Sequence, residues 1–111
     1  MRQITRDAAY AFIRDERFRR DNTEVRDGFL LLHNNAIAWL APRSGKVLFS
    51  LCGWGTPTTR ERINGLLEVL GIPARLHQQA HEQYVYVQGE SVPIDTSAEF
   101  FFTNDGKLEV L

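Results

Sequence analysis

One short segment of the sequence, residues 53–62 (Gly-Trp-Gly-Thr-Pro-Thr-Thr-Arg-Glu-Arg), gathers side chains that are suited to binding. It brings an indole, three hydroxyls and two guanidinium groups to the expected start of a helix, whose free backbone amides favour an anion. Aromatic and arginine side chains together are also typical of nucleic-acid contacts and of protein hot spots. The binding residues predicted in this segment are Trp54, Thr56, Thr59, Arg60 and Arg62.

A purely structural interpretation of the same segment is also open. In this interpretation Trp54 packs the helix onto a sheet, Thr58 caps the helix, and Arg60 and Arg62 are solvated. The glycines on both sides of Trp54 would let the chain leave a strand sharply beside the bulky indole. The two interpretations differ in whether the indole and the guanidinium groups are free to meet a ligand.

Histidine and cysteine, the soft metal ligands, are few in this sequence. His77 and His81 have the four-residue spacing that grips zinc from a helix, but their segment is predicted as strand and turn, where the two rings diverge. Only one cysteine is present, so no Cys-x-x-Cys pair exists. Cys52 continues an apolar strand, which indicates a buried and inert thiol. We therefore predict no metal site and no cofactor.

Sequence motifs of the common catalytic sites are absent. The chain has no P-loop, no Gly-x-Ser-x-Gly, no His-Glu-x-x-His and no Rossmann glycine pattern. Acid–base pairs drawn from Glu61, Glu68 or Asp27 would be found on any globular surface. We predict that the protein is not an enzyme, and we rank a small enzyme last among the alternatives.

The segment that must position these residues is the clearest helix of the sequence, over residues 58–70. Thr58 and Glu61 have the spacing of a capping box, and Gly71 is expected to end the helix. Its apolar face has the spacing i, i+3, i+4 and i+7 and consists of Ile63, Leu66, Leu67 and Leu70. Gly65 inside the helix costs up to about 1 kcal/mol relative to alanine, so we expect a close approach to the sheet there.

The other elements are a helix and a series of short strands. A first helix is expected over residues 5–19, capped by Thr5 and ending in a run of arginines that suits the helix dipole. A three-strand meander follows, entered through the Asp27–Gly28 turn, with a second turn at Asn34–Asn35. Its strands and those after the second helix are predicted at residues 29–32, 36–41, 47–51, 76–79, 84–88, 92–94, 100–103 and 107–111. The fold class predicted is α+β, with one antiparallel sheet (β-meander plus C-terminal hairpins) packed by two helices in a single domain, residues 1–111.

Composition and charge narrow the class of protein. The chain has 111 residues, of which 43% are hydrophobic and 24% charged, as expected of one globular domain with its own core. No apolar run is long enough to span a membrane, and the first residues do not resemble a secretory signal. With a single cysteine as well, we expect a cytoplasmic protein with no membrane partner.

Charge is distributed unevenly along the chain. Residues 1–75 contain 12 basic and 8 acidic side chains, whereas residues 76–111 contain one lysine and six acidic side chains. Such an asymmetry indicates a polar partner or a self-complementary assembly, so a homodimer stays open. The acidic third could imitate nucleic-acid phosphates, and its predicted binding residues are Glu90, Asp95 and Glu99.

Three segments resemble motifs of small proteins of tailed phages and prophages. Residues 53–67 resemble their run of Gly-Trp, a Thr-rich turn, Arg or Lys, Glu-Arg, an aliphatic residue, Asn and Leu, and residues 22–25 resemble their Asn-Thr strand. Residues 32–38 resemble their Leu-His-Gly-Asn-x-Ile-Ala turn, with Asn34 where those proteins tend to have glycine. The similarity covers roughly residues 5–89 and leaves the tail from Glu90 unmatched. It implies a phage origin and no particular mechanism.

Two functions of different classes follow. The first is a phage accessory protein that binds a host or defence protein without catalysis, for example as an anti-CRISPR-like inhibitor in the host cytoplasm. The alternative is a nucleic-acid-binding module, because helix, three-strand meander and helix is the element order of the double-stranded-RNA-binding domain. The net charge of −1 argues against the alternative, since phosphate binding normally needs a basic surplus.

Overall fold

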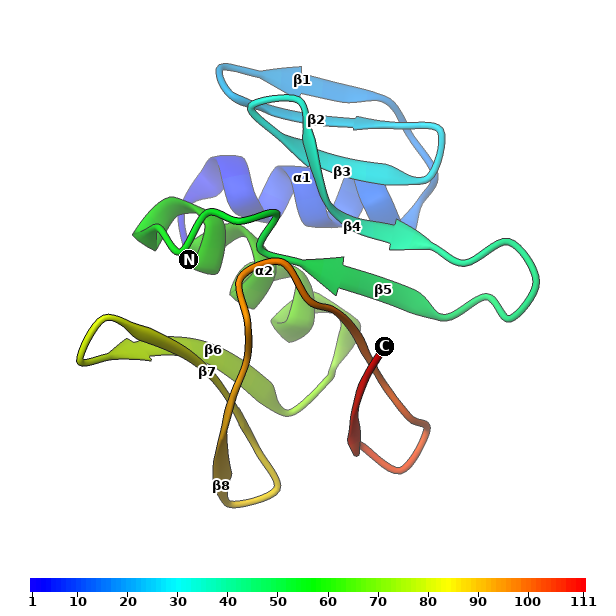
Figure 1. Ribbon diagram of the computed structural model, residues 1–111. Coiled ribbons are helices and arrows are strands. Elements are labelled where there is room, and N and C mark those ends of the chain that lie inside the picture. The colour runs from blue at the N-terminus through cyan, green and yellow to red at the C-terminus, as the bar shows by residue number, and fades with distance from the viewer.

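Two antiparallel sheets and two helices make up the computed structural model, which describes residues 1–111 (Figure 1). The larger sheet has the order β1-β2-β3-β4-β5-β9-β10, and the smaller sheet has the order β6-β7-β8. The helices are α1 (Gln3–Ile13) and α2 (Pro57–Leu70). The strands are β1 (Phe18–Arg20), β2 (Thr23–Arg26), β3 (Phe29–Leu32), β4 (Asn35–Leu40), β5 (Val47–Ser50), β6 (Ala74–Gln79), β7 (Glu82–Val87), β8 (Glu90–Pro93), β9 (Glu99–Phe102) and β10 (Leu108–Val110).

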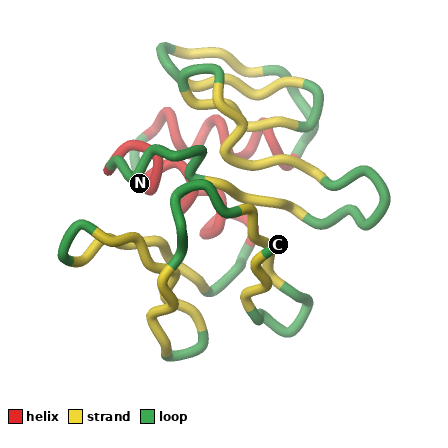
Figure 2. Tube along the Cα trace, viewed as in Figure 1, coloured by secondary structure: helices red, strands yellow, loops and turns green.

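The predicted α+β class is confirmed, and two details of the predicted sheet differ. Five strands rather than three lie between the helices, because Phe18–Arg20 and Thr23–Arg26 pair as an additional hairpin. Two sheets are present where a single one was expected. After β8 the chain leaves the smaller sheet, and β9 pairs with β5 of the larger sheet, Phe100 opposite Phe49 and Glu99 opposite Ser50. Figure 2 shows the smaller sheet below the larger one, with the red helices behind the larger sheet.

The core lies between the larger sheet, the two helices and the smaller sheet. One buried residue from each of five neighbouring strands forms a continuous row: Val25, Leu30, Ala38, Phe49 and Phe100, none more than 2% exposed. Helix α1 adds three small alanines and Phe12 to this core, whereas α2 adds Ile63, Leu66 and Leu67. Leu76, Val85 and Val87 of the smaller sheet join the same apolar cluster.

Tight two-residue turns connect β2 to β3 and β3 to β4. Asp27 and Gly28 have φ of 52° and 80°, as the predicted Asp-Gly turn requires. The next turn is His33–Asn34 rather than the predicted Asn34–Asn35, with φ of 50° and 67°. Asn35 instead pairs with Leu32 as the first residue of β4. The shift by one residue keeps Leu30 and Leu32 on the buried face, since a slip would turn both toward solvent.

The first helix is shorter than predicted. It ends at Ile13, and Asp15 takes a left-handed φ of 54° that turns the chain away from the helix axis. The arginines therefore do not lie on its last turn: Arg20 lies in β1 and reaches back to Asp7, with 2.9 Å between Nη1 and Oδ2. Thr5 is not the cap but a buried residue inside the helix.

The second helix shows why its sequence contains a glycine. Its N-cap is Thr56 with Pro57 as the first helical residue, and it ends at Gly71 with a φ of 75°, as predicted. A Cβ at Gly65 would approach Cγ2 of Thr5 more closely than 3.0 Å. The predicted close approach at Gly65 is thus confirmed, but the neighbouring element is helix α1 rather than the sheet.

Candidate functional site

A cavity of about 510 Å³ lies where two of the sequence motifs meet. One wall comes from the turn between β3 and β4, and the other comes from the loop and first turn of α2. The lining residues are Leu32, His33, Asn35, Ile37, Leu51, Trp54, Thr56, Thr58 and Thr59. Apolar residues form part of the wall, and hydroxyl, amide and imidazole groups supply the rest, an arrangement typical of ligand and peptide pockets.

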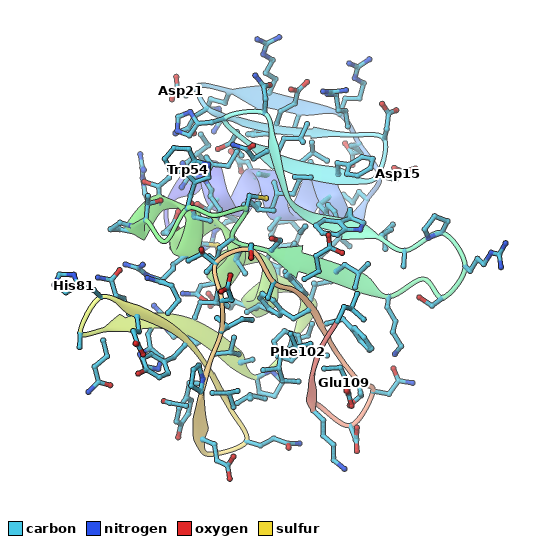
Figure 3. The ribbon with its side chains drawn as sticks, viewed as in Figure 1. Asp15, Asp21, Trp54, His81, Phe102 and Glu109 are labelled. Carbon is cyan, nitrogen blue, oxygen red and sulfur yellow. The ribbon has the colours of Figure 1, made fainter.

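Trp54 stands in the wall of this cavity with 58% of its surface exposed. Cys52 and Gly53, with φ of 55° and 81°, turn the chain out of β5 so that the indole leaves the sheet. The turn is held by Trp54 N donating to Leu51 O at 2.9 Å and by Gly53 N donating to Thr96 O at 2.8 Å. Figure 3 shows Trp54 on the same side of the molecule as Asp21. The interpretation in which this indole packs helix against sheet is therefore wrong.

The threonines of the motif divide between capping and lining. Thr56 caps α2, its Oγ1 accepting from Thr59 N at 3.2 Å and lying 2.9 Å from Thr59 Oγ1. Thr59 is only 2% exposed, so its hydroxyl is committed to this contact. The predicted capping box of Thr58 with Glu61 is wrong, and Thr58 instead lines the cavity.

Arg60 is bonded within the molecule. Its Nη1 donates to Gly55 O at 3.0 Å, to Gln78 Oε1 at 3.0 Å and to Gln83 Oε1 at 2.9 Å. Gln83, itself only 6% exposed, donates through Nε2 to Gln78 Oε1 at 2.9 Å. Arg60 thus connects the loop before α2 to the smaller sheet, and it is not the solvated cation that the structural interpretation expects.

Arg62 is buried, with only 2% of its surface exposed. Its Nε donates to Thr23 Oγ1 at 2.9 Å, and its Nη1 donates to Thr5 Oγ1 at 2.9 Å and to the Glu61 carboxylate. One side chain thereby joins α1, α2 and β2. Arg62 was predicted as a binding residue and, in the alternative, as solvated; its burial contradicts both.

The Glu61 carboxylate accepts hydrogen bonds at the partly exposed edge of this network. Partial burial alone would raise its pKa, but hydrogen bonds from Thr5, from the Arg2 amide and from Arg62 outweigh burial and hold the pKa of Glu61 below its ordinary value. Charge-assisted hydrogen bonds of this kind favour the ionised carboxylate. The ion pair of Glu61 and Arg62 lies within α2, and the hydrogen bonds of this pair to Thr5 and to the Arg2 amide join α2 to α1.

The predicted acidic residues lie on separate elements. Glu90 begins β8, whereas Asp95 follows that strand and accepts from Ser97 N at 2.8 Å and from Ser97 Oγ at 2.6 Å. These bonds lower the pKa of Asp95. Glu99 begins β9 and pairs in register with Ser50. Asp95 and Glu99 thus flank the loop that carries Trp54, and Glu90 lies at the far end of β8.

The residues His77, His81 and Cys52 lie in different parts of the fold and make different contacts. His77 stacks on Tyr84 with 5.3 Å between ring centroids, and its Nε2 lies 3.0 Å from Ser91 Oγ. His81 lies in the turn after β6, labelled in Figure 3, with a left-handed φ of 68°. No group of three or more His, Cys, Asp or Glu residues is arranged to hold a metal ion. Burial raises the pKa of the Cys52 thiol, whose Sγ donates to Ala36 O at 2.8 Å.

Comparison with known proteins identifies the family. The family model described as Kyanoviridae Gp96 protein matches residues 1–108. The chain belongs to the Kyanoviridae Gp96 family. This result confirms the phage origin expected from the motifs, and it extends over the tail that the motif resemblance left unmatched. No curated protein and no solved structure matches this Gp96-family chain. None of its helices is long and apolar enough to cross a membrane.

Several residues of the Gp96-family cavity were missed by the sequence analysis. The apolar residues Leu32, Ile37 and Leu51 were predicted only as strand residues, although they line the cavity beside Trp54. His33, which belongs to the motif of residues 32–38, was not predicted as a binding residue, and it stands in the opposite wall. A signal was present in the sequence, because residues 32–38 and 53–67 carry two separate phage-protein motifs. The structure brings these two motifs to one cavity.

Proposed function

We propose that this Gp96-family protein acts by binding a host or defence protein without catalysis, in the cytoplasm of the infected cell. The observation that supports it best is the exposed indole of Trp54 beside the cavity of about 510 Å³. Exposed tryptophans are the commonest anchors of protein interfaces, and an apolar pocket accepts a side chain from the partner. The hydroxyls of Thr56 and Thr58 and the imidazole of His33 add polar contacts around it.

The contacts and burial of Arg60 and Arg62 favour a protein partner over a nucleic acid. Phosphate contacts require guanidinium or ammonium groups that are free to reach the backbone of the nucleic acid. Arg60 donates three hydrogen bonds within the protein, and Arg62 is buried among α1, α2 and β2. The alternative also depended on a three-strand meander between the helices, where the fold has five strands.

The composition of the cavity wall supports binding rather than turnover. Acid–base catalysis by side chains needs titratable groups within reach of one reacting atom. His33 is the one ionisable side chain that lines the cavity, and its neighbours are hydroxyl, amide and apolar groups. An anti-CRISPR-like inhibitor is the form of this function that the small size and the phage family support.

The experiment is affinity capture from host cells with a matched pair of variants. The tagged chain, Trp54→Ala and Tyr86→Ala are used as baits; Tyr86 on β7 is 50% exposed and does not line the cavity, so it controls for loss of an exposed aromatic. We expect one host protein to be retained by the unchanged chain and by Tyr86→Ala, and to be lost with Trp54→Ala.

The captured protein is then purified and titrated by calorimetry. Loss of a hot-spot tryptophan costs about 2 kcal/mol or more, which raises Kd about 30-fold. A Kd that changes equally for Trp54→Ala and Tyr86→Ala would contradict the proposed site. Failure to capture any protein from infected cells would contradict the proposed function itself.

A further inference from the structure

The face of the larger sheet that points away from the core carries a second row of residues, one from each of six neighbouring strands. Arg26 pairs with Phe29, Phe29 with Trp39, and Trp39 with Leu48. The register of Phe49 with Phe100 places Leu48 beside Phe101, which pairs with Glu109. Successive residues of a strand point to opposite faces, so this row lies back to back with the buried row that contains Leu30, Ala38 and Phe100.

The four central members of this row are large and apolar, and no helix covers them. Phe29 is 41% exposed, and Trp39, Leu48 and Phe101 are half-buried. Both helices contact the other face and lie behind the larger sheet in Figure 1. A contiguous exposed apolar strip of this kind marks an interaction surface in soluble proteins. We call this surface, from Arg26 to Glu109, the outer row.

The two ends of the outer row carry opposite charges. Beside Arg26, the edge strand adds the exposed Arg19, and Arg17 precedes that strand. Two acidic residues lie at this end: Glu24, whose Oε2 lies 3.3 Å from Arg26 Nε, and the exposed Asp27 in the turn that follows Arg26. With Arg17, Arg19 and Arg26, the arginine end keeps a surplus of one positive charge among these five residues.

At the opposite end, Glu109 and Glu99 are both exposed. The lysines nearby are engaged: Lys46 Nζ lies 5.5 Å from the centroid of Phe101, and Lys107 pairs with Asp105 at 3.8 Å. Figure 3 shows Glu109 at the end of the molecule opposite Asp21, which marks the β1–β2 turn. The outer row therefore has a positive end at Arg26 and a negative end at Glu109, which follows the uneven charge of the sequence.

We propose that the outer row is the interface of a symmetric homodimer. A two-fold axis parallel to the strands, passing between Trp39 and Leu48, reverses the row in the second copy. The axis places each Arg26 against the Glu109 of the other copy, at both ends of the same contact. It also brings the central apolar residues together face to face, with strands aligned as in packed sheets.

The dimensions of the outer row agree with such a contact. Six strands have five spacings of about 4.8 Å, so the row is about 24 Å long. This length is comparable with the width of a standard interface, and a single row predicts an interface at the small end of the range. We therefore expect a dimer with a micromolar Kd, in which the end charges contribute visibly.

A charge-swap cycle tests the proposal on the full chain. Sedimentation equilibrium is measured for the unchanged protein, for Arg26→Glu, for Glu109→Arg and for the double variant, at concentrations from micromolar to millimolar. Each swap affects two contacts of the symmetric dimer, so we expect either single variant to raise Kd about tenfold or more. The double variant restores opposite charges and should return Kd to within about threefold of the unchanged chain.

The controls separate this surface from the rest of the protein. Glu90→Lys makes a similar charge change on the smaller sheet and should leave Kd unchanged, as should Tyr86→Ala. All exchanged residues are exposed, and circular dichroism checks that each variant is folded. A monomer at every concentration, or single swaps that dimerise as well as the unchanged chain, would overturn the proposal. The proposed binding of a host protein at Trp54 is tested separately and does not depend on this result.

Discussion

Helices α1 and α2 pack so closely at Gly65 that the usual effect of a glycine-to-alanine change should be reversed. In an ordinary helix, Gly65→Ala would stabilise the protein by up to about 1 kcal/mol. Here the new methyl group would meet Thr5 Cγ2 inside the 3.0 Å limit. Thr5 is 1% exposed and cannot turn away, because its hydroxyl accepts from Arg62 Nη1 at 2.9 Å and also bonds Glu61. A contact inside this limit falls in the upper part of the typical overpacking cost, about 2–3 kcal/mol, and subtracting the helix-propensity gain of up to about 1 kcal/mol leaves an expected net loss of about 1–2 kcal/mol.

A second substitution makes the prediction specific to this contact. Thr5→Ser removes the methyl group but keeps the hydroxyl that Arg62 and Glu61 need. Alone it should cost about 1 kcal/mol for the lost buried methyl group. Combined with Gly65→Ala, the new methyl group fills the vacated space, and stability should return to within about 0.5 kcal/mol of the unchanged chain. Urea unfolding of all four proteins gives the coupling energy directly. A Gly65→Ala protein as stable as the unchanged chain would refute the reasoning, as would a double variant no better than Gly65→Ala.

Three further outcomes follow from the described contacts. Arg62→Met leaves buried oxygens unpaired and should lower the free energy of unfolding by about 3–5 kcal/mol in urea titrations, whereas Arg60→Met, at the partly exposed end of the helix, should cost about 1–2 kcal/mol. The pKa of Glu61 in the folded chain lies below its ordinary value of 4.5, so its contribution to stability is full above pH 4.5 and is lost as pH falls through the lower folded value; Glu61→Gln should therefore show a flatter fall in stability between pH 5 and pH 3. Because burial raises the pKa of Cys52, iodoacetamide should alkylate the native thiol at pH 8 more slowly than the unfolded thiol, and equal rates would contradict its burial.

Local backbone chemistry explains the parts of the fold that the sequence predicted well. The Asp27–Gly28 turn, strand β3 and the end of α2 at Gly71 all lie where expected. At each of these positions the decisive factor is a neighbouring residue that tolerates positive φ, or an unbroken apolar run. Such signals do not depend on distant parts of the chain.

Non-local contacts explain the parts that were predicted wrongly. Arg60 and Arg62 are two residues apart in the same motif, yet one meets the smaller sheet and the other is buried against α1 and β2. The partners of Arg62, Thr5 and Thr23, lie 57 and 39 residues away in the sequence. The end of α1 was misplaced for a similar reason: a run of arginines suits a helix terminus, but pairing of Phe18 with Val25 makes a strand there.

The candidate site was predictable in part from local sequence signals and depends in part on non-local contacts. The motif around Trp54 was recognised because its residue types are unusual together, and the structure places this indole in the wall of a cavity. The apolar residues beside it could not be selected from the sequence, since Leu32, Ile37 and Leu51 have the pattern of ordinary strand residues. Only the fold shows that these three side chains line a cavity at the start of α2.

The pairing of β5 with β9 has a consequence for how the chain reaches its native state. Strands β1 to β5 pair with sequence neighbours and can form early, whereas β5 acquires its second partner only after α2 and the whole smaller sheet have been passed. Long-range pairing of this kind is slow to form because a large loop must close first. Until β9 arrives, one edge of β5 has open backbone groups, so we expect the final closure of the sheet to limit the folding rate and the unclosed intermediate to be the species most prone to aggregation.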